Sequence, residues 1–447
     1  MWEFGEDDDT YPLDSSGNPL GGAVGAITDP AGQPVKDLGY SMSLPTVAMS
    51  NIADTDTEQE WIAIFGNGPN STSGIATLFV LFMDKGRDGW GSGDFTKITT
   101  DYGVPLPGEE LEGYPNGLGS PTAVDIDLNG TTDYVYAGDR LGNLWRFDLT
   151  STTASNWEAI RVFQATYETS PGVETIQPIL TRPLVVKHPA QAGFLITFGT
   201  GSFVTEEDGG NTDIQSIYTI WDELGANPPT ANSNTKDERL VAQTLTNVVD
   251  DSGTVNQTRR ILTSNAVEYA SETGSPGTYG WYIDLDVERA TETTGGATNP
   301  DTAGSGTGPQ YPGEKAIRRF LFRDGVIITT TVLPATDETS CFGARPGAIL
   351  IMDGLTGGDP GDAIIDFNTD TYINEGDLVT VDGQTYSGGL LFDYTDLDGA
   401  LVDLSTLGGE GDTDFLFVSG GNDTVSYRIR DLNDAKTGRL SWTQLQQ

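Results

Sequence analysis

The sequence predicts an all-β protein, and within that class a β-propeller of about six or seven irregular blades with long loop insertions. Two observations favour this architecture. Short apolar, β-branched or aromatic runs recur between clusters of Gly, Asp, Asn and Pro, which is the pattern of strands joined by turns. Helical periodicity is scarce, and repeated antiparallel units without helical partners favour radial closure, because closure protects the sheet edges. A pair of β-sandwiches is the alternative fold.

The expected strands run through the whole chain, at residues 61–65, 76–82, 133–137, 144–148, 184–186, 194–198, 217–221, 280–284, 326–332, 348–352, 415–418 and 424–429. Several belong to a recurring unit in which a turn of small residues precedes a strand with an aromatic residue before an acidic one. The irregular spacing of these units indicates long loops instead of a strict short repeat. Residues 5–37, 226–237 and 291–310 contain few large apolar side chains, and we expect them to form surface loops.

The charge balance limits the classes of partner. The chain has 66 acidic and 23 basic residues and a formal net charge of −43. Such a field repels phosphates, so nucleic-acid binding is not expected, and it keeps a protein soluble in salt-rich surroundings. We attribute most of this charge to an acidic, salt-adapted surface. Only locally clustered carboxylates indicate a ligand.

Composition also restricts catalytic and membrane functions. Cys341 is the only cysteine and His188 the only histidine, so neither an intrachain disulfide nor a Cys/His zinc site can form. A Ser-His-Asp triad would need His188, which lies at an expected strand end before Pro189 and is interpreted as structural. No stretch reaches the roughly 18 apolar residues of a membrane helix. We therefore expect no enzymatic activity and no membrane span.

Residues 1–447 are expected to form a single propeller domain. The first residues have neither the basic nor the apolar region of a signal peptide. Trp2 and Phe4 are typical of a strand already under way. We therefore expect that an upstream N-terminal domain is absent from this chain.

The segment from Asp125 to Asp133 is the strongest candidate for a functional site. Oxygen-bearing side chains stand at its positions 1, 3, 5 and 9, which are Asp125, Asp127, Asn129 and Asp133. With Gly130 at position 6, this is the first half of an EF-hand-type loop, in which position 7, here Thr131, contributes its backbone carbonyl. Converging carboxylates repel one another unless they share a cation, and several oxygen ligands suit Ca²⁺ better than Mg²⁺. Position 12 is Tyr136 instead of the closing Glu, and a solvated turn is the alternative.

A second candidate loop lies between residues 366 and 377. Oxygen-bearing side chains occupy its positions 1, 3, 5, 9 and 12, a fuller register than in the first loop. The expected calcium ligands are Asp366, Asn368, Asp370, Tyr372 and Asp377. Position 6 is Thr371 in place of glycine, which weakens the argument, and an ordinary turn-rich connection is the alternative. Residues 393–399 also concentrate carboxylates, but their different spacing favours a solvated turn.

A resemblance to a known family rests on the segment that contains the first loop. Residues 125–148, which end in Gly-Asp-Arg-Leu-Gly-Asn-Leu-Trp-Arg-Phe-Asp, are similar to the calcium-loop blade of the type IV pilus tip adhesin (PilY) family. Shorter similarities follow the same order at residues 65–71, 175–178, 198–203, 215–222 and 280–285. Together they span nearly the whole chain and resemble the C-terminal propeller domain of that family.

The resemblance implies a pilus assembly factor and adhesin of Gram-negative bacteria. Such a protein is secreted through the periplasm and outer membrane, joins minor pilins at the pilus tip, and contacts a host or abiotic surface. Calcium at the first loop would then modulate pilus extension, retraction and twitching motility. The ligands carried over are Asp125, Asp127, Asn129, the Thr131 carbonyl and Asp133. The chain departs from the family in lacking the large N-terminal region and any Arg-Gly-Asp tripeptide.

Two other functions remain as alternatives. A quinone-cofactor propeller dehydrogenase would hold its cofactor and calcium in a central funnel. Such enzymes commonly use a vicinal disulfide, which this chain cannot form because Cys341 is its only cysteine. An integrin-like adhesion propeller uses similar calcium loops, repeated at regular intervals across several blades. This sequence carries the loop clearly once.

Overall fold

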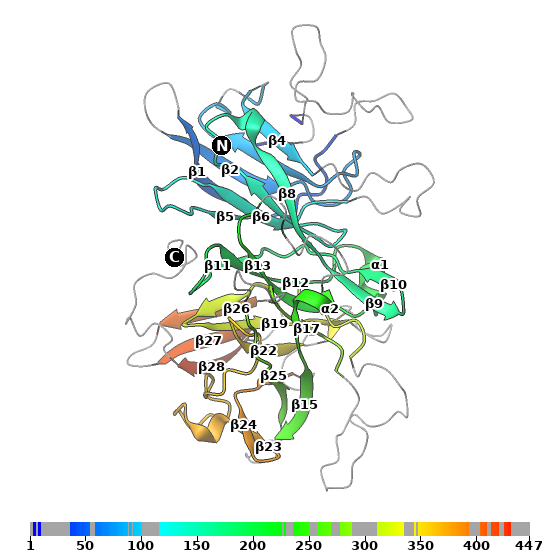
Figure 1. The fold of residues 1–447 in the computed structure, drawn as a ribbon, viewed down its shortest axis with the longest axis vertical. Coiled ribbons are helices and arrows are strands. Elements are labelled where there is room, and N and C mark those ends of the chain that lie inside the picture. Colours follow the sequence, from blue (N-terminus) through cyan, green and yellow to red (C-terminus); the bar gives the residue numbers. More distant parts are fainter. Residues whose placement is uncertain are drawn as a thin grey trace. The chain divides into compact units, whose positions relative to one another are not determined.

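The computed structural model describes residues 3–5, 8–9, 36–53, 59–87, 89–91, 93–100, 116–225, 228, 236–250, 257–269, 278–287, 311–334, 344–345, 347–392, 403–408, 413–419 and 424–430. Most of their regular structure is strand (Figure 1). The chain divides into two compact units. The first contains Met1–Thr166, Pro178–Val185 and Leu224–Ser233, and the second contains Tyr167–Gln177, Val186–Glu223 and Asn234–Gln447.

The first unit holds two four-stranded antiparallel sheets. One has the order β1 (Thr46–Ala53), β2 (Gln59–Gly66), β3 (Thr77–Phe82) and β4 (Phe95–Thr99). The other has the order β5 (Thr122–Val124), β6 (Tyr134–Gly138), β7 (Asn143–Asp148) and β8 (Glu158–Gln164), with the single turn η1 (Ala154–Asn156) before its last strand. Four sequential antiparallel strands are the pattern of a propeller blade.

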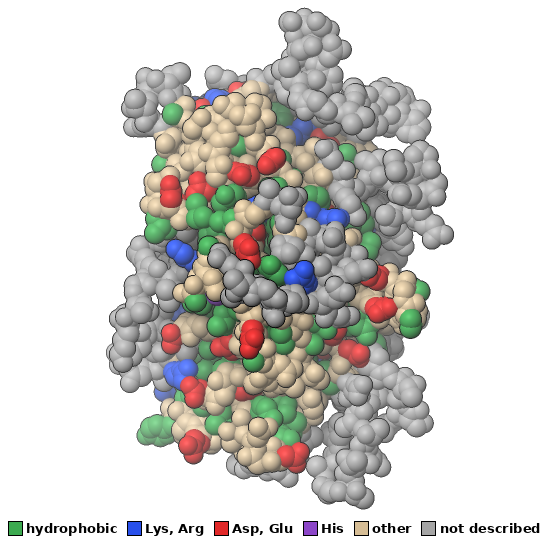
Figure 2. Space-filling model, in the orientation of Figure 1, with side chains coloured by type: hydrophobic (Ala, Val, Ile, Leu, Met, Phe, Trp, Pro, Cys, Tyr) green, Lys and Arg blue, Asp and Glu red, His purple; other side chains and the backbone are tan. Residues whose placement is uncertain are grey.

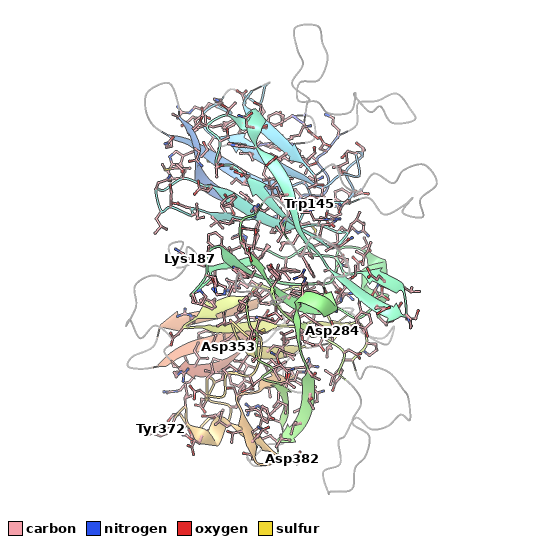
Figure 3. The ribbon with its side chains drawn as sticks, in the orientation of Figure 1. Trp145, Lys187, Asp284, Asp353, Tyr372 and Asp382 are labelled. Carbon is pink, nitrogen blue, oxygen red and sulfur yellow. The ribbon has the colours of Figure 1, made fainter. Side chains whose placement is uncertain are left out.

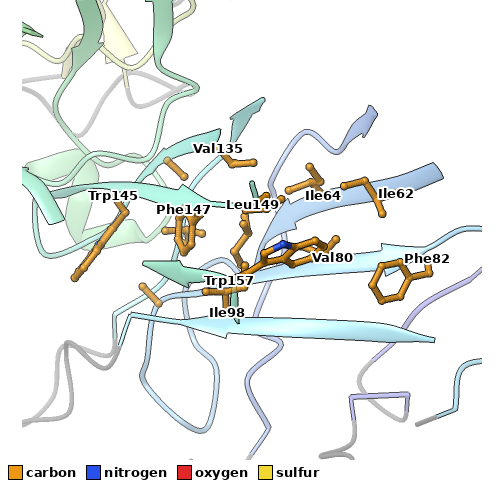
Figure 4. Packing of buried hydrophobic residues seen from close by; sticks show 14 residues of the cluster. Ile62, Ile64, Val80, Phe82, Ile98, Val135, Trp145, Phe147, Leu149 and Trp157 are labelled. Carbon is orange, nitrogen blue, oxygen red and sulfur yellow. The ribbon is translucent and has the colours of Figure 1, made fainter. Parts of the chain in front are cut away.

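These two sheets share one hydrophobic core (Figure 4). The first sheet contributes alternate residues of its strands, including Ile62, Ile64, Val80, Phe82 and Ile98. The second contributes Val135, Trp145, Phe147, Leu149 and Trp157. Each such side chain stabilises the fold by about 1.5–3 kcal/mol when it leaves water. The period-2 alternation of strands therefore sets which residues join the two sheets.

The second unit contains most of the residues of the larger sheets, and Leu184 and Val185 of β11 belong to the first unit. A five-stranded sheet has the order β11 (Leu184–Lys187), β12 (Phe194–Gly199), β13 (Ser216–Asp222), β17 (Gly280–Asp284) and β14 (Val241–Gln243). A six-stranded sheet has the order β15 (Leu245–Asp250), β16 (Gln257–Leu262), β25 (Gly389–Leu391), β22 (Ala348–Asp353), β19 (Val326–Thr330) and β18 (Leu321–Arg323). The last sheet has the order β26 (Asp403–Gly408), β27 (Thr413–Ser419) and β28 (Thr424–Arg430).

Short ribbons and single helical turns complete the described part of the chain. The ribbons are β9 (Thr166–Ser170) with β10 (Val173–Ile176), β20 (Leu333–Pro334) with β21 (Ala344–Arg345), and β23 (Val379–Val381) with β24 (Gln384–Tyr386). The helical turns are α1 (Glu206–Gly210), α2 (Lys236–Arg239) and η3 (Glu375–Asp377). Within the described ranges, no helix is long and apolar enough to cross a membrane.

The predicted fold class is confirmed. All twelve predicted strands are present, within one or two residues at their ends. The predicted surface loops at 5–37, 226–237 and 291–310 fall mainly outside the described residues, as does Cys341. His188 is buried; its Nδ1 accepts hydrogen bonds from the backbone N–H groups of Ala190 (3.1 Å) and Gln191 (2.9 Å), and its ring packs on Trp221. Burial lowers the pKa of His188, which fits a neutral structural residue.

Candidate metal centre

The first acidic loop connects β5 to β6, and the sheet holds its two ends together. Val124 and Tyr134 are paired across the two strands, and the N–H of Asp133 donates to the Val124 carbonyl at 2.9 Å. Asp125 and Asp133 therefore stand side by side at the base of the loop, where each is only 5% exposed. Asp127 lies farther out and is exposed.

Three carboxylates converge in this loop. Asp125, Asp127 and Asp133 each bring an oxygen within 4.8 Å of the other two, and they are the only such group of at least three His, Cys, Asp or Glu residues that the described ranges contain. Three negative charges at this spacing repel one another, most strongly where two of them are buried. Hard oxygen donors in this arrangement fit a divalent cation such as Ca²⁺.

Backbone N–H groups hold these carboxylates in place. Asp125 accepts from the N–H of Leu128 at 2.6 Å and, with its other oxygen, from Gly130 at 2.7 Å. Asp133 accepts from the N–H of Ile126 at 2.9 Å. The turn needs positive φ angles of 62° at Leu128 and 96° at Gly130, and the glycine takes this conformation without strain. The loop is thus preorganised with its acidic side chains directed inward.

Asn129 and Thr131, the remaining predicted ligands, lie in the same loop. The Asn129 side-chain oxygen accepts from the Thr131 backbone N–H at 2.7 Å and from its hydroxyl at 2.5 Å. The Asn129 amide nitrogen donates to Asp127 at 3.1 Å. All five predicted residues are therefore brought together.

Asn51, on β1, is a member of this site that the sequence did not reveal. Its amide nitrogen donates to the Asp133 carboxylate at 3.2 Å and to the Thr132 carbonyl at 3.0 Å. Its oxygen accepts from the Thr131 hydroxyl at 2.7 Å, and the N–H of Thr132 donates to the Met49 carbonyl at 2.7 Å. The loop therefore joins the β5–β8 sheet to the β1–β4 sheet.

The second acidic loop, in the other unit, precedes β23 and contains η3. Asp366 and Asp377 are 3% and 2% exposed, whereas Tyr372 is 70% exposed (Figure 3). Asn368 and Asp370 each accept from the backbone N–H two residues ahead, at 2.9 Å and 2.8 Å, and both are exposed. Two of the five predicted ligands are thus buried at the base of the loop and three form its rim.

Burial raises the pKa of the Asp377 carboxyl, and the negative charge of Asp366 adds to this effect against several backbone N–H donors. The two buried carboxylates are therefore close enough to repel each other. Asn374, at position 9, accepts from the N–H of Gly376 at 2.7 Å and caps η3. Residues 393–399, the third acidic cluster, lie outside the described ranges.

Elsewhere in the described ranges, acidic side chains form no other group of three at the spacing found in the first loop. On the face drawn in Figure 2 they are scattered among hydrophobic and uncharged side chains. This distribution is what an acidic solvated surface produces, so the large net charge does not itself indicate a ligand.

Comparisons with known proteins place the chain in a family. The model of the "PilY1 beta-propeller domain" matches residues 29–256, more than half of the 447 residues. The type IV pilus biogenesis factor PilY1 of Pseudomonas aeruginosa is 28% identical over 346 residues, which are 72% of this chain and 26% of that protein. A PilY1 homologue of Xylella fastidiosa is 29% identical over 334 residues, 72% of this chain and 19% of the homologue.

A solved structure agrees with this assignment. The crystal structure of the Pseudomonas aeruginosa PilY1 C-terminal domain matches with a TM-score of 0.65 and 25% identity, over 88% of this chain and 73% of that one. The chain spans about a quarter or less of the curated relatives it matches. On the family match and this structural likeness, the chain belongs to the PilY1 β-propeller family.

Proposed function

We propose that this propeller acts in a type IV pilus-associated protein as an assembly factor and adhesin at the pilus tip, with calcium bound by the loop from Asp125 to Asp133. The family membership supports the pilus association. The convergence of three carboxylates in one preorganised loop carries the calcium part of the proposal. The partners would be minor pilins and a host or abiotic surface, and the location would be the cell surface.

The residues that would hold the ion are Asp125, Asp127, Asn129, Thr131 through its carbonyl, and Asp133. A bound calcium ion would supply the positive charge that these side chains lack. Asn51 positions both Asp133 and Thr131, so the order of the loop is coupled to β1. When the carboxylates repel one another the Asn51 contacts are strained, and when they are neutralised the contacts are kept. Occupancy of the loop can therefore select between two arrangements of neighbouring sheets, which is how calcium would modulate pilus extension and retraction.

Calorimetric calcium titration of Asp133→Ala tests the proposal. The variant loses a buried carboxylate and should lose the tightest binding event, while the sheet register stays intact. Asp148→Ala, which removes an equal charge from the end of β7, where the side chain accepts from Thr150, serves as the matched control and should bind as the parent does. In cells, Asp133→Ala should alter piliation and the control should not. A titration unchanged by Asp133→Ala would refute the calcium assignment.

We propose no catalytic step for this protein. The only histidine is buried among aromatic rings in the second unit. The residues gathered in the two loops are carboxylates and amides that lie within their own turns.

A further inference from the structure

We propose that residues 366–377 form a second divalent-cation site, in the second unit, which binds independently of the first loop. Asp366 is 3% exposed, and its Oδ1 has no hydrogen-bond partner. Its other oxygen accepts from the N–H of Thr371 at 3.0 Å, which turns the carboxylate toward the interior of the loop. A buried carboxylate oxygen without a partner is costly, and a cation in the loop would remove that cost.

A second buried carboxylate, that of Asp377, lies against the start of the same loop. Asp377 accepts from the N–H groups of Phe367 at 2.9 Å and Asn368 at 3.2 Å through one oxygen, and from Asn374 at 3.0 Å through the other. The hydrogen bonds to Phe367 and Asn368, which directly follow Asp366, place Asp377 against the start of the loop. Two negative groups thus meet at the base of the loop.

Arg259, a buried basic side chain beside this loop, bonds to backbone carbonyls and to another carboxylate. Arg259 donates to the backbone carbonyls of Asp377 at 3.1 Å and Ser387 at 2.5 Å, and its ion pair, at 3.6 Å, is with Asp250. Its guanidinium lies over the Phe367 ring at 3.8 Å. Among the described ion pairs, none includes either Asp366 or Asp377. Arg259 therefore does not neutralise this pair of carboxylates by direct contact.

The backbone of this loop repeats that of the first loop in a different sequence. The leading aspartates, Asp125 and Asp366, each accept from the N–H five residues ahead, and positions 3 and 5 each accept from the N–H two residues ahead. The closing aspartate accepts from the N–H directly after the leading one in both loops. Positions 4 and 6 have positive φ in both, at 59° for Thr369 and 77° for Thr371 in the second.

The two loops differ in where their carboxylates stand. This difference sets the expected binding affinity of the second loop and the ion that it should prefer. The closing carboxylate stands at position 12 in the second loop and at position 9 in the first, and only the first brings three carboxylates within 4.8 Å of one another. Two buried carboxylates with amide and rim oxygens form a flexible oxygen cage, which suits Ca²⁺ better than Mg²⁺. We therefore expect a weaker calcium site than the first one.

Calcium calorimetry on the full chain tests this site separately from the first. The parent should show two binding events, and Asp133→Ala should keep the weaker one. Asp366→Asn retains an oxygen for the Thr371 N–H and should weaken that remaining event by about a hundredfold. Asp382→Asn, an exposed turn residue between β23 and β24, is the matched control and should bind as the parent does (Figure 3).

Terbium luminescence supplies a readout local to this loop. Tyr372 stands at position 7, so excitation of its phenol should sensitise a terbium ion bound there. Tyr372→Phe should lower the sensitised emission and leave the calorimetric affinity unchanged, because position 7 binds through its backbone. Asp366→Asn should abolish the emission that Tyr372 sensitises, with an unaltered circular dichroism spectrum in EDTA. A single binding event in the parent, or an Asp366→Asn titration identical to that of Asp382→Asn, would overturn the second site and leave the first untouched.

Discussion

The two acidic loops, one in each compact unit, share a backbone and differ in what they are attached to. The loop at Asp125–Asp133 bonds through Asn51 to a neighbouring sheet. The loop at 366–377 instead ends in the capped turn η3 and a short ribbon. The same arrangement of backbone N–H groups around carboxylates thus occurs in two different structural surroundings. The first loop contacts its neighbouring sheet through a side chain that also bonds a predicted ligand, Asp133. The second loop contacts β16 and β28 through its backbone, because Arg259 donates to the Asp377 carbonyl and the N–H of Asp366 donates to the Arg428 carbonyl.

The largest expected difference between the loops is in their response to calcium removal. At a calcium concentration about 100 times the dissociation constant, binding stabilises a loop by about 2.7 kcal/mol, which slows local opening about a hundredfold. After EDTA treatment, the amides of residues 126–131 should exchange with solvent faster by that factor. The amides of Met49 and Asn51 on β1 should also exchange faster. Amides of 367–371 should change less. Hydrogen exchange with mass spectrometry measures both, and equal changes in the two loops would contradict their ranking.

Asn51→Ala breaks the attachment that distinguishes the first loop. It removes a donor to Asp133 and one of the two acceptors near the Thr131 hydroxyl, the other being Asn129. Loss of a residue that positions a metal ligand typically lowers affinity by about tenfold or more, so calorimetry should show that decrease in the tighter event alone. Asn156→Ala, at an exposed asparagine whose side-chain amide donates to the Ser151 hydroxyl, is the control and should bind normally. A normal affinity for Asn51→Ala would mean that the two sheets are not coupled through the loop.

A feature can be predicted from the sequence when the residues that form it lie close together along the chain. Ligand spacing within one loop is local, so all ten candidate ligands could be named. Asn51 could not, because it reaches Asp133 across 82 residues of chain and carries no pattern of its own. Strand β16 is not among the twelve predicted strands, for a related reason. Its sequence contains Arg259 and Arg260, which look exposed, yet both are buried, and Arg260 is neutralised by Glu314 at 2.5 Å. Long-range pairs decide such positions, and a single sequence does not show them.

Asn374→Asp makes the second loop resemble the first by adding a carboxylate at position 9. Its oxygen can still accept from the N–H of Gly376, so the cap of η3 should survive. The added carboxylate should tighten calcium binding by about tenfold, or about 1.4 kcal/mol, and lower the melting temperature in EDTA through repulsion with Asp366 and Asp377. Titration and thermal unfolding with and without calcium measure the two opposite effects. If the calcium affinity falls instead, a carboxylate at position 9 does not set the affinity of these sites.

The smallest expected effects concern position 6, which is Gly130 in the first loop and Thr371 in the second. Both residues have positive φ, a conformation that costs a residue with a Cβ roughly 1–2 kcal/mol. Gly130→Thr should therefore destabilise the calcium-free first unit by about that amount, and no steric clash adds to it, because the space around Gly130 is open. Thr371→Gly should stabilise the second loop by less, about 0.5 kcal/mol, since glycine also loses more backbone entropy on folding. Thermal unfolding in EDTA measures the change in stability that each of these two substitutions causes. Opposite signs would show that the two loops share one backbone requirement at this position, and a loss of stability in both variants would show that each residue is fitted to its own loop.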